Sequence, residues 1–160
     1  MGQKGFSLVE LLIVIAIMIV LTSIATLQFS SMVRKREIEK QTRMLYTDLS
    51  EVRQKALYEK TPRMVRLTGS EFTVYPGTST AAAPVIRRTL SYPVVLSNGD
   101  AAIDIRFDTF GISDNSTLFI CVDPASSSVA PLNSLRVTAT GVDLAQRKEG
   151  TCSDANISLK

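Results

Sequence analysis

Glu10 is the residue whose type and position most clearly suggest chemistry in this chain. It is the only charged residue between Gly5 and Arg34, and it lies within an otherwise uncharged, largely apolar run over residues 6–29. Ionisable groups inside such a run are costly and usually functional. If the chain were cut after Gly5, Phe6 would carry a new α-amino group about one helical turn from Glu10. That amine, or the same amine of a neighbouring copy, is the partner expected for the carboxylate.

The remaining composition argues against an enzyme. The chain has 160 residues, no histidine, no CxxC pair and two cysteines, Cys121 and Cys152. Without histidine it cannot build a Ser-His-Asp site, a Cys-His site or a zinc site with imidazole ligands. A glycine-rich phosphate loop is also absent from the sequence. We therefore expect a non-enzymatic protein that needs no cofactor.

One acidic turn was considered as a metal site. Asp104, Asp108, Asp114 and Asn115 cluster around a predicted turn, and calcium binds several such oxygen atoms. Their spacing does not match an EF-hand loop, and turns are normally rich in these residues. No metal site is predicted.

Two basic pairs were considered as nucleic-acid contacts. Arg87-Arg88 and Arg147-Lys148 are not accompanied by the aromatic residues that stack on single-stranded bases. The formal net charge of +3 is too near neutral to indicate nucleic acid by itself. Both pairs are predicted to be solvated surface, and no nucleic-acid partner is expected.

The apolar run over residues 6–29 is long enough to cross a bilayer. About 24 residues at 1.5 Å each give roughly 36 Å of helix. A plain signal-anchor helix is one alternative. A secretory signal peptide cut after Ser23-Ile24-Ala25 is another. Glu10 and the helical pattern beyond this cut argue against the signal peptide.

The helical pattern continues well past the apolar run. No proline or glycine occurs between Phe6 and Thr61. Over residues 30–61 the apolar residues fall on one helical face, which predicts packing against a domain. They are Ile38, Leu45, Leu49, Val52 and Ala56. Thr61-Pro62 is a plausible stop, because a residue before proline disfavours helix. One helix is predicted over about residues 6–60.

Residues 62–160 have the pattern of a β-rich domain. Short β-prone runs alternate with turn residues such as those at 97–100 and 140–141. Strands are predicted near residues 64–68, 71–75, 85–90, 94–96, 102–107, 117–122, 135–138 and 142–145. This pattern predicts an α+β fold, with a C-terminal antiparallel β-sheet domain packed on the long N-terminal helix.

The N-terminus resembles the prepilin signature. Lys4-Gly5-Phe6-Ser7-Leu8-Val9-Glu10 has a basic leader, a glycine, a phenylalanine and then a glutamate four residues further on. The resemblance implies that residues 1–5 form a leader, cleaved after Gly5 by a prepilin peptidase. It also implies methylation of the new N-terminal Phe6. Glu10 would pair with an N-terminal amine during filament assembly.

The resemblance extends into the β-rich part. Phe107–Gly111, the strand Leu118–Val122 and Leu135–Gly141 are together similar to the pseudopilin H and FimT/FimU minor pilin family. This pilin-like family implies a low-abundance subunit that helps prime and build a type IV pilus near its tip. Its partners would be other minor pilins, the major pilin and the inner-membrane assembly machinery. The span lacks the mid-helix proline common in major pilins.

The same resemblance implies a location. The chain would cross the inner membrane once through residues 6–29, hold residues 62–160 in the periplasm, and later enter the pilus fibre. A periplasmic domain permits a Cys121–Cys152 disulfide. One rule opposes this orientation: the basic residues from Arg34 to Arg43 would place the C-terminal part in the cytoplasm. Because Glu37 and Glu39 interleave with them, the periplasmic orientation is retained.

Two alternatives stay open within this resemblance. One is the H pseudopilin of a type II secretion system, although such pseudopilins often lack a cysteine pair. The other is a DNA-binding pilin of the uptake machinery, which salt-dependent DNA binding would support.

Overall fold

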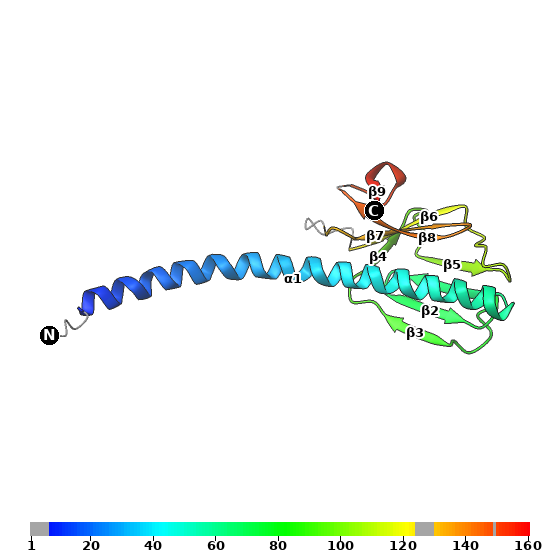
Figure 1. The fold of residues 1–160 in the computed structure, drawn as a ribbon, viewed down its shortest axis with the longest axis horizontal. Helices are drawn as coiled ribbons and strands as arrows, with labels where there is room; N and C mark the ends of the chain where they lie inside the picture. The colour runs from blue at the N-terminus through cyan, green and yellow to red at the C-terminus, as the bar shows by residue number, and fades with distance from the viewer. Residues whose placement is uncertain (1–6, 124–129, 149) are drawn as a thin grey trace. The chain divides into compact units, whose positions relative to one another are not determined.

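The computed structural model describes residues 7–123, 130–148 and 150–160, with the side chains of residues 24–28 left aside. The chain divides into two compact units, residues 1–34 and residues 35–160, and each is treated by itself. The chain forms one long helix, α1, followed by strands β1–β9, with a short 3-10 helix, η1, before β9. Figure 1 labels α1 and the strands from β2 to β9.

Helix α1 spans Leu8–Glu59, a length of 52 residues. The predicted helix over residues 6–60 is confirmed within the described residues. It is uninterrupted because it contains no proline or glycine. At its end, Lys60 adopts a left-handed conformation with φ 53°, as is common one residue beyond a helix. Thr61 then precedes Pro62, so the chain leaves the helix and enters β1.

The strands form two antiparallel sheets within the described residues. The first has the order β3 (Ile86–Thr89), β2 (Glu71–Tyr75), β1 (Arg63–Thr68) and β5 (Ala102–Phe107). The second has the order β4 (Val94–Leu96), β6 (Thr117–Val122), β7 (Ser134–Thr138), β8 (Val142–Arg147) and β9 (Ile157–Leu159). The strands expected from the sequence are confirmed. Strand β9 and η1 (Asp154–Asn156) were not predicted from the sequence. The predicted antiparallel β-sheet domain is confirmed, and its strands are divided between two sheets.

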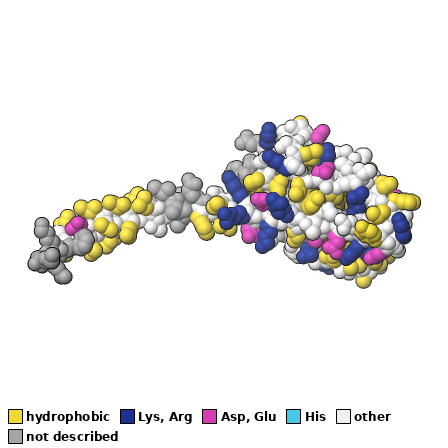
Figure 2. All heavy atoms as spheres, in the orientation of Figure 1, with side chains coloured by type: hydrophobic (Ala, Val, Ile, Leu, Met, Phe, Trp, Pro, Cys, Tyr) yellow, Lys and Arg dark blue, Asp and Glu magenta, His cyan; other side chains and the backbone are white. Residues whose placement is uncertain are grey.

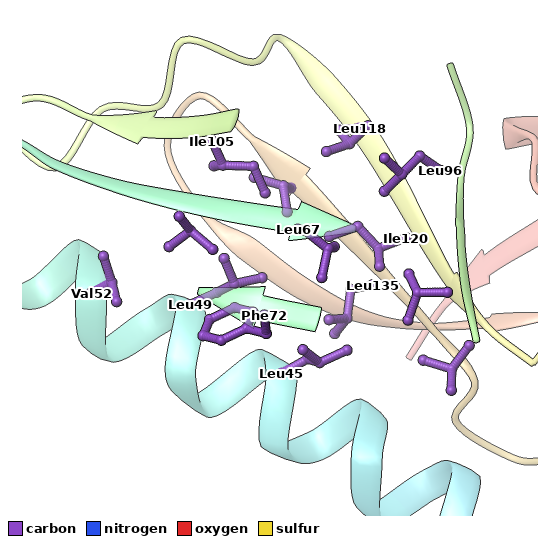
Figure 3. Close-up of a cluster of buried hydrophobic side chains, with 14 of the residues drawn as sticks. Leu45, Leu49, Val52, Leu67, Phe72, Leu96, Ile105, Leu118, Ile120 and Leu135 are labelled. Carbon is purple, nitrogen blue, oxygen red and sulfur yellow. The ribbon is translucent and has the colours of Figure 1, made fainter. Parts of the chain in front are cut away.

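The apolar stripe of α1 forms one side of the core of the second unit. Its predicted members, Ile38, Leu45, Leu49, Val52 and Ala56, are each at most 3% exposed. Figure 3 shows Leu45 and Leu49 close to Phe72, beneath strands that contribute Leu67, Ile105, Ile120 and Leu135. Full burial of such a side chain contributes about 1.5–3 kcal/mol, so this stripe is sufficient to hold the helix on the sheets.

Hydrogen bonds also join α1 to loops of the second unit at particular residues. Gln41 exchanges two hydrogen bonds with the backbone of Tyr92, and the Arg53 Nε–H donates to the carbonyl of Gly111 at 2.8 Å. Gly111 has φ +69°, and a Cβ there would lie 3.4 Å from both the Cγ and the carbonyl oxygen of Arg53. Such a Cβ would be in close but ordinary contact, so the positive φ, which L side chains rarely adopt, is the main reason why glycine suits this position.

Candidate assembly site

The surface of α1 in the first unit is apolar on every face. Twelve large aliphatic side chains between Leu8 and Leu21 are 44–78% exposed, and Figure 2 shows this segment covered largely by hydrophobic atoms. They are Leu8, Val9, Leu11, Leu12, Ile13, Val14, Ile15, Ile17, Met18, Ile19, Val20 and Leu21. A soluble surface helix would have a single apolar stripe. Apolar residues all round, exposed in one chain, indicate a segment that other apolar groups enclose.

Hydroxyl groups on this helix are satisfied internally. Thr22 Oγ1 donates a 2.7 Å hydrogen bond to the carbonyl of Met18, and Ser23 Oγ donates one of 2.7 Å to the carbonyl of Val20. The hydroxyl hydrogens of these two side chains are therefore satisfied within the helix. Among the described residues, no helical stretch is both long and apolar enough to traverse a bilayer. The span expected over residues 6–29 includes positions outside this description and stays a prediction.

Glu10 lies in the first turn of α1 and is exposed. The partial positive charge of a helix N-terminus favours a carboxylate at this place. Within the described ranges, no basic side chain forms an ion pair with it, and the next basic residue along the chain is Arg34. The pairing of Glu10 with an N-terminal amine involves residues outside this description and stays a prediction. Gly5 and Phe6 lie outside the described residues, so cleavage and methylation there stay predictions.

The expected disulfide joins Cys121 of β6 to Cys152, with 5.9 Å between their Cα atoms. The bridge is buried against Phe119 and Ile157. It holds the segment after β8 to the second sheet, where β9 pairs with β8. The bridge therefore ties the segment between β8 and β9 to β6, in addition to the pairing of β9 with β8.

The acidic turn is a set of ion pairs and turn hydrogen bonds. Asp104 accepts two hydrogen bonds from Arg66, at 2.7 and 2.8 Å, which raise the pKa of the guanidinium. Arg106 lies 3.3 Å from both Asp104 and Asp114. Asp108 Oδ1 accepts the backbone N–H of residues 110 and 112. In the part of the chain that the structure describes, no group of carboxylates is arranged to hold a metal ion.

The basic pairs differ from each other. Arg87 pairs with Glu71 at 3.0 Å, and Arg88 pairs with Asp48 at 2.9 Å, both from partly exposed side chains. Arg147 is only 4% exposed, so the prediction of a solvated pair at 147–148 is wrong for that residue. Alternate residues of a strand face opposite sides, and Arg147 shares the inward side of β8 with Ala145. Its Nη1 donates to the carbonyl of Gly150 at 2.6 Å.

Comparison with known proteins gives two findings. Residues 1–26 match the family model described as the prokaryotic N-terminal methylation motif. Two crystal forms of the Pseudomonas aeruginosa type IV minor pilin FimU have a similar fold. The first has a TM-score of 0.55 at 11% identity and covers 69% of this chain and 90% of FimU. The second has a TM-score of 0.51 at 14% identity and covers 66% and 90%. No curated protein matches the sequence significantly.

The two findings concern different parts of the chain. The matched motif includes the segment from Lys4 to Glu10, which carries the resemblance to prepilins. At this low identity the FimU match establishes the fold, a long helix packed on antiparallel sheets. This chain thus combines the prokaryotic N-terminal methylation motif with a fold similar to that of a type IV minor pilin.

Proposed function

We propose that this chain is a structural subunit that helps to prime and build a type IV pilus, entering the filament through its N-terminal helix near the tip. The observation that carries the proposal is the single carboxylate of Glu10 on a helix surface that is otherwise apolar on every face. Such a surface suits burial among other helices of the same kind. The other minor pilins and the major pilin are the expected neighbours.

Processing comes first in this proposal. A prepilin peptidase removes residues 1–5 and methylates Phe6, while residues 6–29 anchor the chain in the inner membrane. The domain then lies in the periplasm, where the Cys121–Cys152 disulfide is chemically permitted. The same disulfide supports the pilus over a type II secretion system, because H pseudopilins often lack the pair.

The free-energy cost of the charged Glu10 carboxylate differs between the membrane and the filament core. Near the end of a membrane span, a carboxylate can reach the interface, so its cost stays below the roughly 2.5–3.5 kcal/mol of a charge at a helix centre. In a packed filament core it loses that water. Pairing with the Phe6 amine of an adjacent subunit then offsets the desolvation, and a subunit in the wrong axial position leaves a buried charge unpaired. Glu10 thus matters for assembly and not for insertion.

The test compares Glu10→Ala with Glu51→Ala in the native host. Glu51 is another exposed carboxylate on α1, paired with Lys55 at 2.7 Å and outside the apolar segment. Both variants should reach normal levels in the membrane fraction. Glu10→Ala should be depleted at least about tenfold in sheared filaments, since breaking a buried ion pair costs about 3–5 kcal/mol. Normal incorporation of Glu10→Ala would remove the basis of the proposal.

A further inference from the structure

The net charge of this chain is concentrated in ten residues of α1. Residues 34–43 hold five basic and two acidic residues, which leaves thirteen basic and thirteen acidic residues in the rest of the chain. The formal net charge of +3 therefore equals the charge of this short stretch. No charged residue lies between Glu10 and Arg34, so the stretch begins where the uncharged part of the helix ends.

Four of these cations form what we call the basic collar: Lys35, Arg36, Lys40 and Arg43. Lys35 is half-buried, and the other three are exposed. With 3.6 residues per turn, Arg36, Lys40 and Arg43 share the helix face opposite to the buried Ile38. Figure 2 shows Lys and Arg side chains gathered at the start of the second unit. Because the opposite face of the helix packs on the core, these three side chains are left facing the solvent.

The collar is only partly neutralised by its own helix. Arg43 donates two hydrogen bonds to Glu39, at 2.8 and 3.2 Å. Lys40 lies 3.8 Å from Glu37, with 78% and 47% of the two side chains exposed. The interaction free energy of such exposed ion pairs is small. Within the described residues, neither Lys35 nor Arg36 forms an ion pair. The collar retains positive charge for an external anion.

We propose that the basic collar binds an anionic phospholipid surface, which rests on the membrane anchoring given under the proposed function. Basic residues directly after an apolar helix attract anionic headgroups by about 1 kcal/mol each, an effect that fades over a Debye length. Residues 34–43 extend about 13 Å along the helix. This distance is comparable to the depth of the headgroup layer together with part of one Debye length, within which the attraction acts. The contact holds the domain at the membrane until the subunit leaves for the filament.

The sequence order favours lipid over nucleic acid. A collar that follows an apolar helix surface is brought to the headgroup layer whenever that helix enters a bilayer. Surfaces that bind single-stranded nucleic acid usually add stacking aromatic side chains to their positive charge, and no aromatic residue occurs between Arg34 and Leu45. The collar thus fits a surface of closely spaced monoanionic headgroups.

The test uses the full chain in vesicles of phosphatidylcholine and phosphatidylglycerol, with spin-labelled versions of each lipid. The preference for phosphatidylglycerol among motionally restricted lipids is measured at low and high salt. Lys35→Gln/Arg36→Gln/Lys40→Gln removes three collar charges. Lys55→Gln/Lys60→Gln/Lys148→Gln removes three exposed charges elsewhere and is the matched control. The collar variant should lose at least about threefold of the preference, high salt should reduce it in the unaltered chain, and the control should retain it.

The failures are distinguishable. Restricted lipid with no preference for phosphatidylglycerol, or a preference equal in the two variants, would overturn the collar proposal alone. The absence of restricted lipid of either kind would overturn membrane anchoring and the collar proposal with it. Collar-dependent DNA binding without a lipid preference would assign this surface to nucleic acid and overturn the proposal as well.

Discussion

Gln41 of α1 and Tyr92, 51 residues later, are joined by two hydrogen bonds. The Gln41 Nε2 donates to the Tyr92 carbonyl at 2.8 Å, and the Tyr92 backbone N–H donates to Gln41 Oε1 at 2.9 Å. The side-chain amide thus pairs with the backbone N–H and C=O of one residue, as a residue of an adjacent antiparallel strand does. It ties α1 to the segment between β3 and β4, the connection that passes from one sheet to the other.

Gln41→Ala should destabilise the domain by about 1–3 kcal/mol, because it removes both hydrogen bonds from a side chain that is only 6% exposed. Gln54→Ala is the control, since Gln54 is an exposed glutamine on the same helix. Chemical unfolding of both variants measures the difference. Equal stability of the two variants would mean that the Gln41 contact contributes nothing.

The ion pair of Asp48 with Arg88 predicts a specific pH dependence. Burial raises the pKa of Asp48 above its ordinary value of 3.8, Arg88 lowers it in part, and Glu51 raises it further. The contact is an ion pair rather than an aligned hydrogen bond, although N and O are 2.9 Å apart. Since the folded protein binds this proton more tightly than the unfolded chain, its contribution to stability decreases as pH rises from 3.8 to the raised pKa.

Asp48→Asn should remove this contribution. The free energy of unfolding of the original chain, relative to Asp48→Asn, should improve as pH falls through the raised pKa and stay constant above it. Each unit by which the pKa is raised corresponds to about 1.4 kcal/mol of this change. Urea unfolding at several pH values measures it. A pH-independent difference between the original chain and Asp48→Asn would contradict the assignment.

Loss of the disulfide should be costly. Cys121 and Cys152 are 31 residues apart, and closing a loop of this size contributes roughly 3.5 kcal/mol in the chain-entropy model. Cys121→Ser/Cys152→Ser should therefore lose about 2–5 kcal/mol of stability, and hydrogen exchange should rise first in β9. Alkylation of both thiols in the mature protein without a reductant would contradict the bridge.

Processing gives a prediction with a matched glycine control. The mature protein should begin at a methylated Phe6, which intact-mass analysis from the native host would detect. Gly5→Leu should block cleavage, because the predicted cut follows a residue without a side chain, whereas Gly2→Leu should be cleaved normally. A mature start near Thr26, or an uncut Met1 in the unaltered chain, would refute the prepilin interpretation.

The sequence by itself determined the features that depend on local pattern. The lack of proline and glycine before Thr61 sets the length of α1, and the spacing from Ile38 to Ala56 sets its buried face. Alternation and turn residues located β1 to β8. Side-chain spacing carries this information, since the helical and strand repeats are properties of neighbouring residues. The cleavage site and the role of Glu10 were also inferred from sequence, and they stay predictions.

Tertiary structure decided what depends on distant segments. The division into two sheets follows from β5 pairing with β1 while β4 pairs with β6, and no local repeat encodes that choice. The same holds for the Gln41–Tyr92 contact and the burial of Arg147. Strand β9 was missed because three residues carry too little periodicity, and it exists through its pairing with β8 beside the disulfide. Contacts of this kind join residues that are far apart in the sequence and form only when the chain closes large loops. The pattern of a short segment therefore cannot predict them.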